Sequence, residues 1–129
     1  MENTLGHQTF DDWLTRYGHA WEKGDADAVV NLFASDGRYY ETPFDEPMVG
    51  SDAIRSYWQE GASDAQEEVT FSFTILSWDN NTGIAHWRAE FKRVPSGIHV
   101  DLDGILLAAF SPDGRCTLFK EWWHRTEAG

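Results

Sequence analysis

The sequence predicts an α+β domain in which helices come first and an antiparallel sheet follows. Apolar residues recur at helical spacing near the start of the chain: Phe10, Trp13, Leu14, Tyr17, Ala20 and Trp21. From residue 68 onward, apolar and polar residues alternate in long runs that turn-forming residues separate. The first pattern is typical of a helix with one buried face, and the second is typical of half-buried strands. Helices of this kind cover one face of a sheet.

The first two predicted helices meet at a Gly-Asp break. Thr9 and Asp12 form a capping-box start for the first helix, which runs to about Lys23. Gly24 favours a helix end and Asp25 favours a helix start, because glycine adopts the left-handed conformation and a carboxylate accepts from free amides. The second helix carries a short apolar stripe: Val29, Val30, Leu32 and Phe33.

A short strand and a third helix follow. The Asp-Gly pair at 36–37 ends the second helix and turns the chain into a strand over residues 38–42. Alternation places two polar-tipped residues on one face of this strand: Tyr39 and Glu41. Ser51 caps the third helix and Gly61 marks its end. The apolar face of that helix contains Ile54, Tyr57 and Trp58.

Four long strands joined by tight turns complete the predicted fold. Three of them cover residues 68–79, 84–94 and 99–110, and the last contains EWWH at 121–124. In the second, His86, Arg88 and Glu90 share one face, whereas Trp87, Ala89 and Phe91 share the other. In the last, Glu121 and Trp123 lie opposite Trp122 and His124. Because a shift of one residue exchanges the two faces, the pattern leaves open which face is inside.

Length, charge and composition limit the classes of function. The 129 residues predict one domain spanning 1–129, with 1–8 as a flexible N-terminus. A net charge of −12 excludes nucleic acid and an anionic membrane surface as expected partners, because both would repel the chain. Cys116 is the single cysteine, and no apolar run has signal or membrane-spanning length, so a cytoplasmic location is expected. The seven Trp and eight Phe predict an aromatic-lined cavity for a small, mainly apolar molecule.

Three long motifs resemble a known superfamily. AHWRAEFKRVPSG at 85–97, LDGILLAAFSPDGRC at 102–116 and EWWHR at 121–125 are similar to bacterial SnoaL-like proteins. These belong to the ketosteroid-isomerase-like branch of the NTF2-like superfamily. The resemblance covers nearly the whole chain and implies a cone-shaped α+β barrel, with three N-terminal helices packed on a curved antiparallel sheet. It also implies a homodimer through the sheet face, but no particular reaction.

The segment from Arg16 to Asp25 resembles the first helix of ketosteroid isomerases. This likeness places Tyr17 where that family has an oxyanion-hole tyrosine, although Tyr17 could equally be an ordinary core ring. The family's general base falls on Thr42, whose neighbour Glu41 could serve instead if burial raised its pKa. The family's second oxyanion partner falls on Leu106. Two of the three roles therefore lack the expected residue, and steroid isomerisation is not predicted.

A second resemblance is to limonene-epoxide-hydrolase-like proteins, which use an Arg-x-Asp pair on one strand and an Asp on the last strand. Arg88, Glu90 and Glu121 occupy similar places here. In that interpretation Arg88 and Glu90 would flank one water, and Glu121 would protonate a substrate oxygen. The alternative is a structural ion-pair network.

The predicted function is cofactor-independent acid/base chemistry of the isomerase, cyclase, dehydratase or hydratase type. A non-catalytic binding protein, an epoxide-hydrolase-like enzyme and a protein-interaction module are the alternatives. No cofactor is predicted, and no metal, since His99 and Asp101 with His86 or His124 form only a weak ligand pattern. The catalytic candidates are Tyr17, Glu41, Arg88, Glu90 and Glu121. The ligand-binding candidates are Trp21, Tyr39, Tyr57, Trp58, His86 and Trp123.

Overall fold

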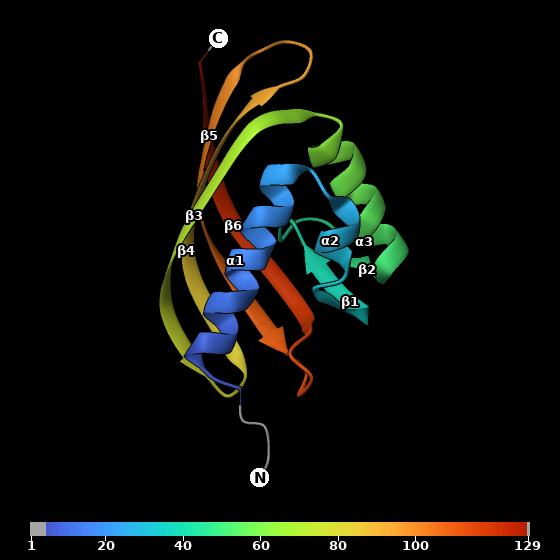
Figure 1. Cartoon of the computed structure of the whole chain (residues 1–129), viewed down its shortest axis with the longest axis vertical. Coiled ribbons are helices and arrows are strands. Elements are labelled where there is room, and N and C mark those ends of the chain that lie inside the picture. Colours follow the sequence, from blue (N-terminus) through green and yellow to red (C-terminus); the bar gives the residue numbers. More distant parts are fainter. Residues whose placement is uncertain (1–4, 129) are drawn as a thin grey trace.

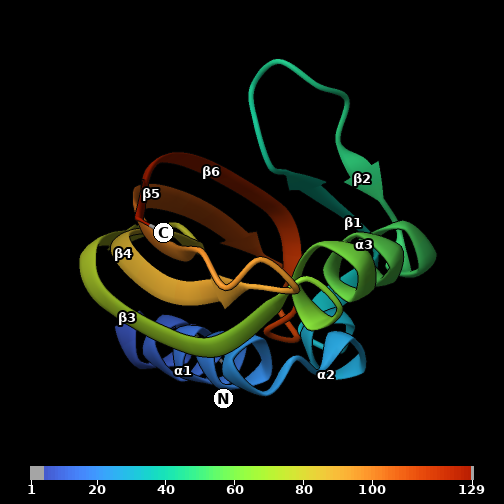
Figure 2. The same cartoon turned by 90° about the horizontal axis from the view of Figure 1, so that it is seen from above.

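A computed structural model describes residues 5–128 and shows a strongly curved sheet with helices along one face (Figures 1 and 2). The elements are α1 (His7–Lys23), α2 (Ala26–Val30), β1 (Phe33–Tyr40), β2 (Met48–Val49), α3 (Ser51–Trp58), the π-helical turn η1 (Gln59–Ser63), β3 (Gln66–Asp79), β4 (Thr82–Arg93), β5 (His99–Phe110) and β6 (Cys116–Ala128). This arrangement confirms the predicted α+β fold class.

The sheet has the strand order β2-β1-β6-β5-β4-β3. Strands β3 to β6 form an antiparallel meander, whereas β1 pairs in parallel with β6. Curvature brings the two ends of the sheet toward the helices without closing a barrel, and the result is a cone (Figure 2). The interior of this cone contains the hydrophobic core and the candidate site.

Helix α1 begins earlier than the sequence predicts. Gly6 is the N-cap, and its N–H donates to Thr9 Oγ1 over 3.3 Å, so Thr9 lies inside the first turn rather than at the cap. Of the segment predicted to be flexible, residues 7 and 8 are helical, and residues 1–4 lie outside the described part of the chain. The predicted break is confirmed: Gly24 is left-handed, with φ 65°, and Asp25 accepts a hydrogen bond from the Ala28 amide over 3.0 Å.

Helix α2 is shorter than predicted, because tertiary contacts take over the chain after Val30. The Leu32 carbonyl accepts hydrogen bonds from the Cys116 amide over 3.0 Å and from the Trp13 indole over 2.9 Å. The chain is therefore extended from Phe33 onward, as strand β1 beside β6. The prediction that Leu32 and Phe33 are helical was wrong for this reason.

Helix α3 differs from its prediction at both ends. Gly50, with φ 89°, is the N-cap and Ser51 is already the first helical residue. At the other end Gly61 does not stop the helix, since η1 continues through it to Ser63. The turn between β3 and β4 does match its prediction: Asn80 and Asn81 have φ values of 51° and 58°, as a two-residue hairpin loop requires.

One sheet glycine makes room for a large side chain of the site. A methyl group added to Gly104 would lie 2.5 Å from the Trp122 carbonyl oxygen and 2.8 Å from Trp123 Cβ. Gly104→Ala is therefore expected to lower the free energy of unfolding by about 1–3 kcal/mol, which urea denaturation can measure. Gly61→Ala is the matched control, because nothing lies within 4 Å of the added methyl. Equal stability of both variants would contradict close packing at Gly104.

Candidate functional site

The candidate site is a cavity of about 180 Å³ between the helices and the inner face of the sheet. It is small beside the range of about 300–1,000 Å³ that is typical of sites for drug-sized ligands. Sixteen residues line it: Tyr17, Trp21, Tyr39, Glu41, Tyr57, Trp58, Gly61, Ala62, Gln66, Trp87, Phe91, Arg93, Leu102, Glu121, Trp123 and Arg125. Eight of the residues proposed from the sequence are among them: Tyr17, Trp21, Tyr39, Glu41, Tyr57, Trp58, Glu121 and Trp123.

A chain of hydroxyl groups ends at a buried carboxyl group in the cavity wall. The Tyr39 hydroxyl donates to Glu121 Oε2 over 3.1 Å, and the Tyr17 and Tyr39 hydroxyl oxygens are 3.4 Å apart. Because Tyr39 gives its only hydroxyl proton to Glu121, Tyr17 must be the donor to Tyr39. The chain therefore runs from α1 through β1 to β6. The Tyr17 proton is already engaged in it.

Among residues 5–128, Glu121 is the only acidic or basic residue that is buried, with 6% of its surface exposed. Burial raises the pKa of its carboxyl from 4.5 to about 8. The Tyr39 hydrogen bond lowers this pKa, and the nearby Glu41 charge raises it further. Burial also raises the pKa of Tyr17 and Tyr39 well above the ordinary value, so both remain neutral donors. Glu121 is thus mostly protonated at neutral pH.

A second carboxyl group approaches the same cavity from the segment after β1. Glu41 Oε2 accepts a hydrogen bond from the Tyr57 hydroxyl over 3.0 Å, and the Glu41 carbonyl accepts one from the Trp123 indole over 3.3 Å. These two contacts hold Glu41 between α3 and β6. Unlike Glu121, Glu41 is only half-buried. The cavity therefore contains two carboxyl groups in different surroundings.

Two tryptophans of the cavity wall carry unused hydrogen-bond donors. Trp58 is 4% exposed and Trp87 is 2% exposed, and the indole N–H of each is buried without a partner among residues 5–128. In contrast, the Trp21 indole donates to Gln66 Oε1 over 2.7 Å. A buried unpaired donor costs about 1–3 kcal/mol, so both groups lower the stability of the fold.

The β4–β5 hairpin and the C-terminus lie together at one end of the sheet (Figure 1), and the exposed side chains that line the cavity near this end define its mouth. Arg93 and Arg125 line this end, with side chains 33% and 53% exposed. Both guanidinium groups contact the same oxygen, Glu127 Oε2, over 3.3 Å and 3.2 Å. The mouth is therefore cationic, whereas the inner part of the cavity carries the Tyr17 and Tyr39 hydroxyl groups and the Glu121 carboxyl group.

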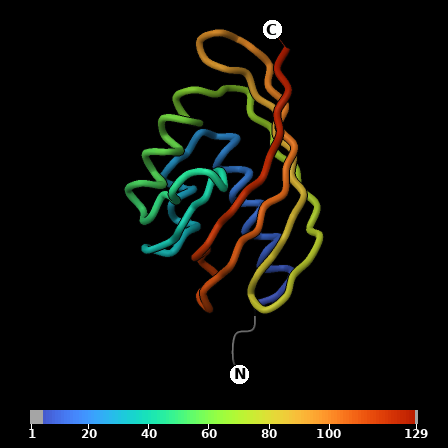
Figure 3. The backbone as a smooth tube through the Cα atoms, turned by 180° about the vertical axis from the view of Figure 1, so that it is seen from behind, coloured from blue at the N-terminus to red at the C-terminus, as the bar shows by residue number. Residues whose placement is uncertain are grey.

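Three predicted site residues lie on the opposite face of the sheet, which Figure 3 shows from behind. His86 pairs with Asp103 over 2.7 Å, Arg88 contacts the same carboxylate over 3.5 Å, and Glu90 is exposed. The expected grouping of Arg88 and Glu90 with Glu121 around one water is therefore not formed. The physical reason is burial: the other face of β4 carries Trp87, Ala89 and Phe91, which enter the core.

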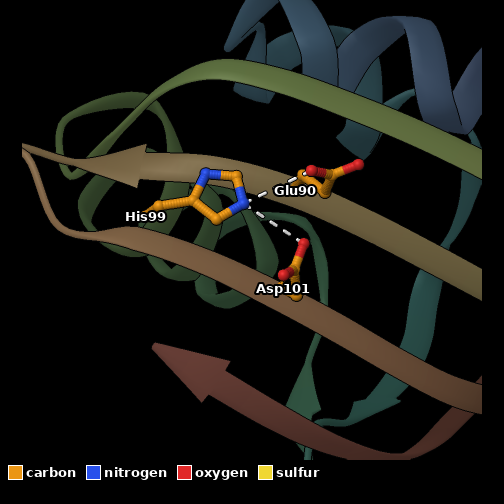
Figure 4. Close-up of side chains that lie close together, drawn as sticks. All are labelled: Glu90, His99 and Asp101. Atoms are coloured by element: carbon orange, nitrogen blue, oxygen red, sulfur yellow. Dashed lines mark hydrogen bonds and ion pairs between the residues drawn. The ribbon is translucent and has the colours of Figure 1, made fainter. Parts of the chain in front are cut away.

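The outer face also carries a cluster of possible metal ligands, Glu90, His99 and Asp101 (Figure 4). His99 Nε2 lies 3.3 Å from a Glu90 oxygen and 3.3 Å from an Asp101 oxygen. The three side chains are each about half exposed, and this geometry is also that of an exposed ion pair of imidazolium with carboxylates. His86 does not join the cluster, because Asp103 holds it.

Several cavity residues were missed in the sequence, namely Gln66, Trp87, Phe91, Arg93, Leu102 and Arg125. The available signal was the apolar content of the two faces of β4. The face with Trp87 and Phe91 has far more apolar surface to bury than the face with His86, Arg88 and Glu90. Arg93 and Arg125 continue the inner faces of β4 and β6, two residues beyond Phe91 and Trp123.

A SnoaL-like domain family matches residues 14–119. The chain belongs to the SnoaL-like family. The matched segment begins within α1 and ends within β6, two residues before Glu121. Among residues 5–128, no helix is both long and apolar enough to cross a membrane.

Two solved structures share the fold of this SnoaL-like domain. One is the epoxide hydrolase/cyclase-like enzyme SalBIII, which takes part in pyran ring formation in the polyether salinomycin. It is 19% identical with a TM-score of 0.78, over 91% of this chain and 92% of that one. The other is a putative isomerase from Bacillus subtilis, 16% identical with a TM-score of 0.81, over 94% and 90%. At these identities the likeness concerns the fold.

Proposed function

We propose that this SnoaL-like domain catalyses isomerisation or cyclisation of a small, mainly apolar molecule by proton transfer alone. The observation that carries the proposal is the buried Glu121 carboxyl, which lines the cavity and receives the Tyr17–Tyr39 hydroxyl chain. A protonated carboxyl with a pKa of about 8 is suited to donate a proton near neutral pH. The reactions named for the two structural neighbours are of this general kind.

In the proposed reaction Glu121 and Glu41 have opposite roles. Glu121 gives its proton to a carbonyl or epoxide oxygen, while Glu41 accepts a proton from a carbon or hydroxyl group of the same molecule. Pairs of carboxyl groups in different surroundings divide acid and base roles in this way. Tyr39 stabilises the Glu121 carboxylate that forms, because its hydrogen bond to Oε2 strengthens as charge develops. For the enone, Glu41 then returns its proton to the γ-carbon and the enol O–H returns its proton to Glu121. For cyclisation, the proton passes from Glu41 back to Glu121 through solvent. No atom is gained or lost in either case, so the product is an isomer of the substrate.

The test is turnover of two probes whose reactions are isomerisations: cyclohex-3-en-1-one, which gives the conjugated enone, and 4,5-epoxypentan-1-ol, which gives a cyclic ether. Glu121→Gln is expected to lower kcat for the accepted probe by about a hundredfold or more, because general acid catalysis contributes about 10²–10⁴. The rate should also fall as pH rises past about 8, where Glu121 loses its proton.

Glu90→Gln is the matched control, because this carboxylate lies on the outer face of the sheet, and it should leave kcat unchanged. Loss of turnover in Glu90→Gln would instead favour the epoxide-hydrolase-like alternative. Equal catalysed rates for the wild type and Glu121→Gln would contradict the proposed role of Glu121. Turnover no faster than without protein, with calorimetric binding of the probes retained, would indicate a non-catalytic binding protein.

The outer sheet face has its own proposed role. Trp122 and Leu76 are 45% and 57% exposed there. Exposed apolar side chains of this kind are suited to a protein contact. We keep the homodimer through this face as a prediction. The interaction-module alternative would use the same surface.

A further inference from the structure

The mouth of the cavity carries more positive charge than the rest of this acidic chain would suggest. Among residues 5–128, Arg93 and Arg125 are the two cationic side chains that line the cavity. They share one counter-charge, Glu127, so the mouth has a net charge of +1. The whole chain has a net charge of −12. A neutral ligand would gain little from a local cationic site of this kind.

The inner part of the cavity has a different character. Its lining includes the buried Glu121 carboxyl, which accepts the Tyr39 hydroxyl proton on Oε2. A protonated carboxyl keeps one O–H to donate, so its partner must be an acceptor oxygen or nitrogen. The Tyr17 and Tyr39 protons are engaged in the chain to Glu121 and do not compete for that acceptor.

We infer that the ligand is a small monocarboxylate with an uncharged oxygen in its apolar body. The carboxylate binds between Arg93 and Arg125, and the second oxygen accepts a hydrogen bond from the Glu121 carboxyl. A single negative charge fits because it balances the +1 of the mouth, and guanidinium groups match the planar carboxylate. The inference rests on the proposed function in that it concerns the same cavity.

The inferred binding mode also fits the layout of strand β6. Glu121, Trp123, Arg125 and Glu127 alternate on its inner face, and exposure rises from 6% at Glu121 to 53% for the Arg125 side chain. Four residues of a strand span about 13 Å, which sets the scale of the separation between Glu121 and Arg125. A carboxylate at the mouth would thus hold the uncharged oxygen toward Glu121, where the proposed proton transfer takes place.

Calorimetry with two matched probes tests the inference. 4-Oxocyclohexane-1-carboxylate carries the acid and the second oxygen, and 4-oxocyclohexane-1-carboxamide is its neutral counterpart. The acid is expected to bind at least about tenfold more tightly than the amide, and higher salt should reduce this difference. Arg93→Gln and Arg125→Gln should each weaken acid binding about tenfold and leave amide binding unchanged. Arg88→Gln, on the outer face, should affect neither probe.

A third variant separates a binding role from a structural one. Glu127→Gln removes the carboxylate that competes for both guanidinium groups, so it should tighten acid binding several-fold. If the arginines only hold Glu127 in place, this variant will not strengthen binding. Thermal unfolding of each variant checks that the fold is intact.

Three results would overturn the inference. They are equal affinity for acid and amide, arginine variants that weaken both probes alike, and no binding of either probe at millimolar concentration. Tighter binding of the matched phosphonate than of the carboxylate would also overturn it, because the ligand would then be a dianion. The proposed function fails separately, through unchanged turnover in Glu121→Gln, and that result leaves these binding measurements intact.

Discussion

Replacing Glu121 with Gln is expected to remove a large loss of stability that the wild type suffers as pH rises. The buried carboxyl has a pKa of about 8 in the folded protein and an ordinary value near 4.5 when unfolded. Below pH 4.5 both states hold the proton and the group does not disfavour folding. Between these two values the unfolded state releases the proton and the folded state keeps it, so the free energy of unfolding falls.

The size of the effect follows from the separation of the two pKa values. One pKa unit corresponds to about 1.4 kcal/mol, so the loss between pH 4.5 and 8 is on the order of 3–5 kcal/mol. Glutamine does not titrate, and the stability of Glu121→Gln relative to the wild type should therefore increase by this amount. The sign follows because the unfolded state binds fewer protons than the folded state throughout this range.

Urea denaturation at pH 5, 6, 7 and 8 measures this difference, with Glu90→Gln as the exposed control. The control should follow the wild type at every pH. If the Glu121→Gln and wild-type curves run parallel, Glu121 titrates normally. The proposal that Glu121 is a proton donor near neutral pH would then lose its physical basis.

A buried carboxyl of this kind points to function rather than to folding. Around Glu121 the wall consists of aromatic rings, and an apolar side chain of similar volume would fill the space without the pH-dependent loss. The Tyr17–Tyr39 chain offsets only part of the cost of burial, since the pKa of Glu121 remains raised. Groups that destabilise a fold in this way are typical of sites where a reactive state is needed.

The sequence predicted the fold well wherever local signals agree with tertiary packing. Strand β5 spans residues 99–110 as predicted, and Asn80 and Asn81 form the predicted hairpin turn. Helix α2 shows where such reasoning fails. Leu32 has an apolar side chain at helical spacing, but its carbonyl pairs with Cys116 on the last strand. A contact across 84 positions leaves no trace in a local pattern.

The candidate site was predicted in part, and the errors concentrate on one strand. Residues of α1 and α3 were placed in the cavity because their apolar stripes indicate which side is buried, and Glu121 on β6 was placed there by the resemblance to epoxide-hydrolase-like proteins. On β4 the polar face was chosen for its chemistry, although burial favours the other face. His86, Arg88 and Glu90 therefore lie outside, and Trp87 and Phe91 lie inside. The alternation along β4 was read correctly, and the difference lies in which of its two faces was assigned to the cavity.

Substitutions at two adjacent positions of β4 test directly which of its faces is buried. Trp87 is 2% exposed and contacts Trp21 and Phe71, with ring centroids 5.8 Å and 6.2 Å away. Trp87→Ala is therefore expected to lower the free energy of unfolding by about 3–5 kcal/mol, through lost burial and the cavity left behind. Arg88→Ala, one residue away, should change it by no more than about 0.5 kcal/mol, because its side chain is 64% exposed. Urea denaturation measures both.

Trp87→Phe then separates the ring of Trp87 from its unpaired N–H. Phenylalanine keeps most of the aromatic surface and removes a buried donor without a partner, so its cost should be much smaller than that of alanine. A larger loss of stability at position 88 than at position 87 would reverse the assignment of faces on β4. The cavity would then be lined by His86, Arg88 and Glu90, as the sequence alone suggested.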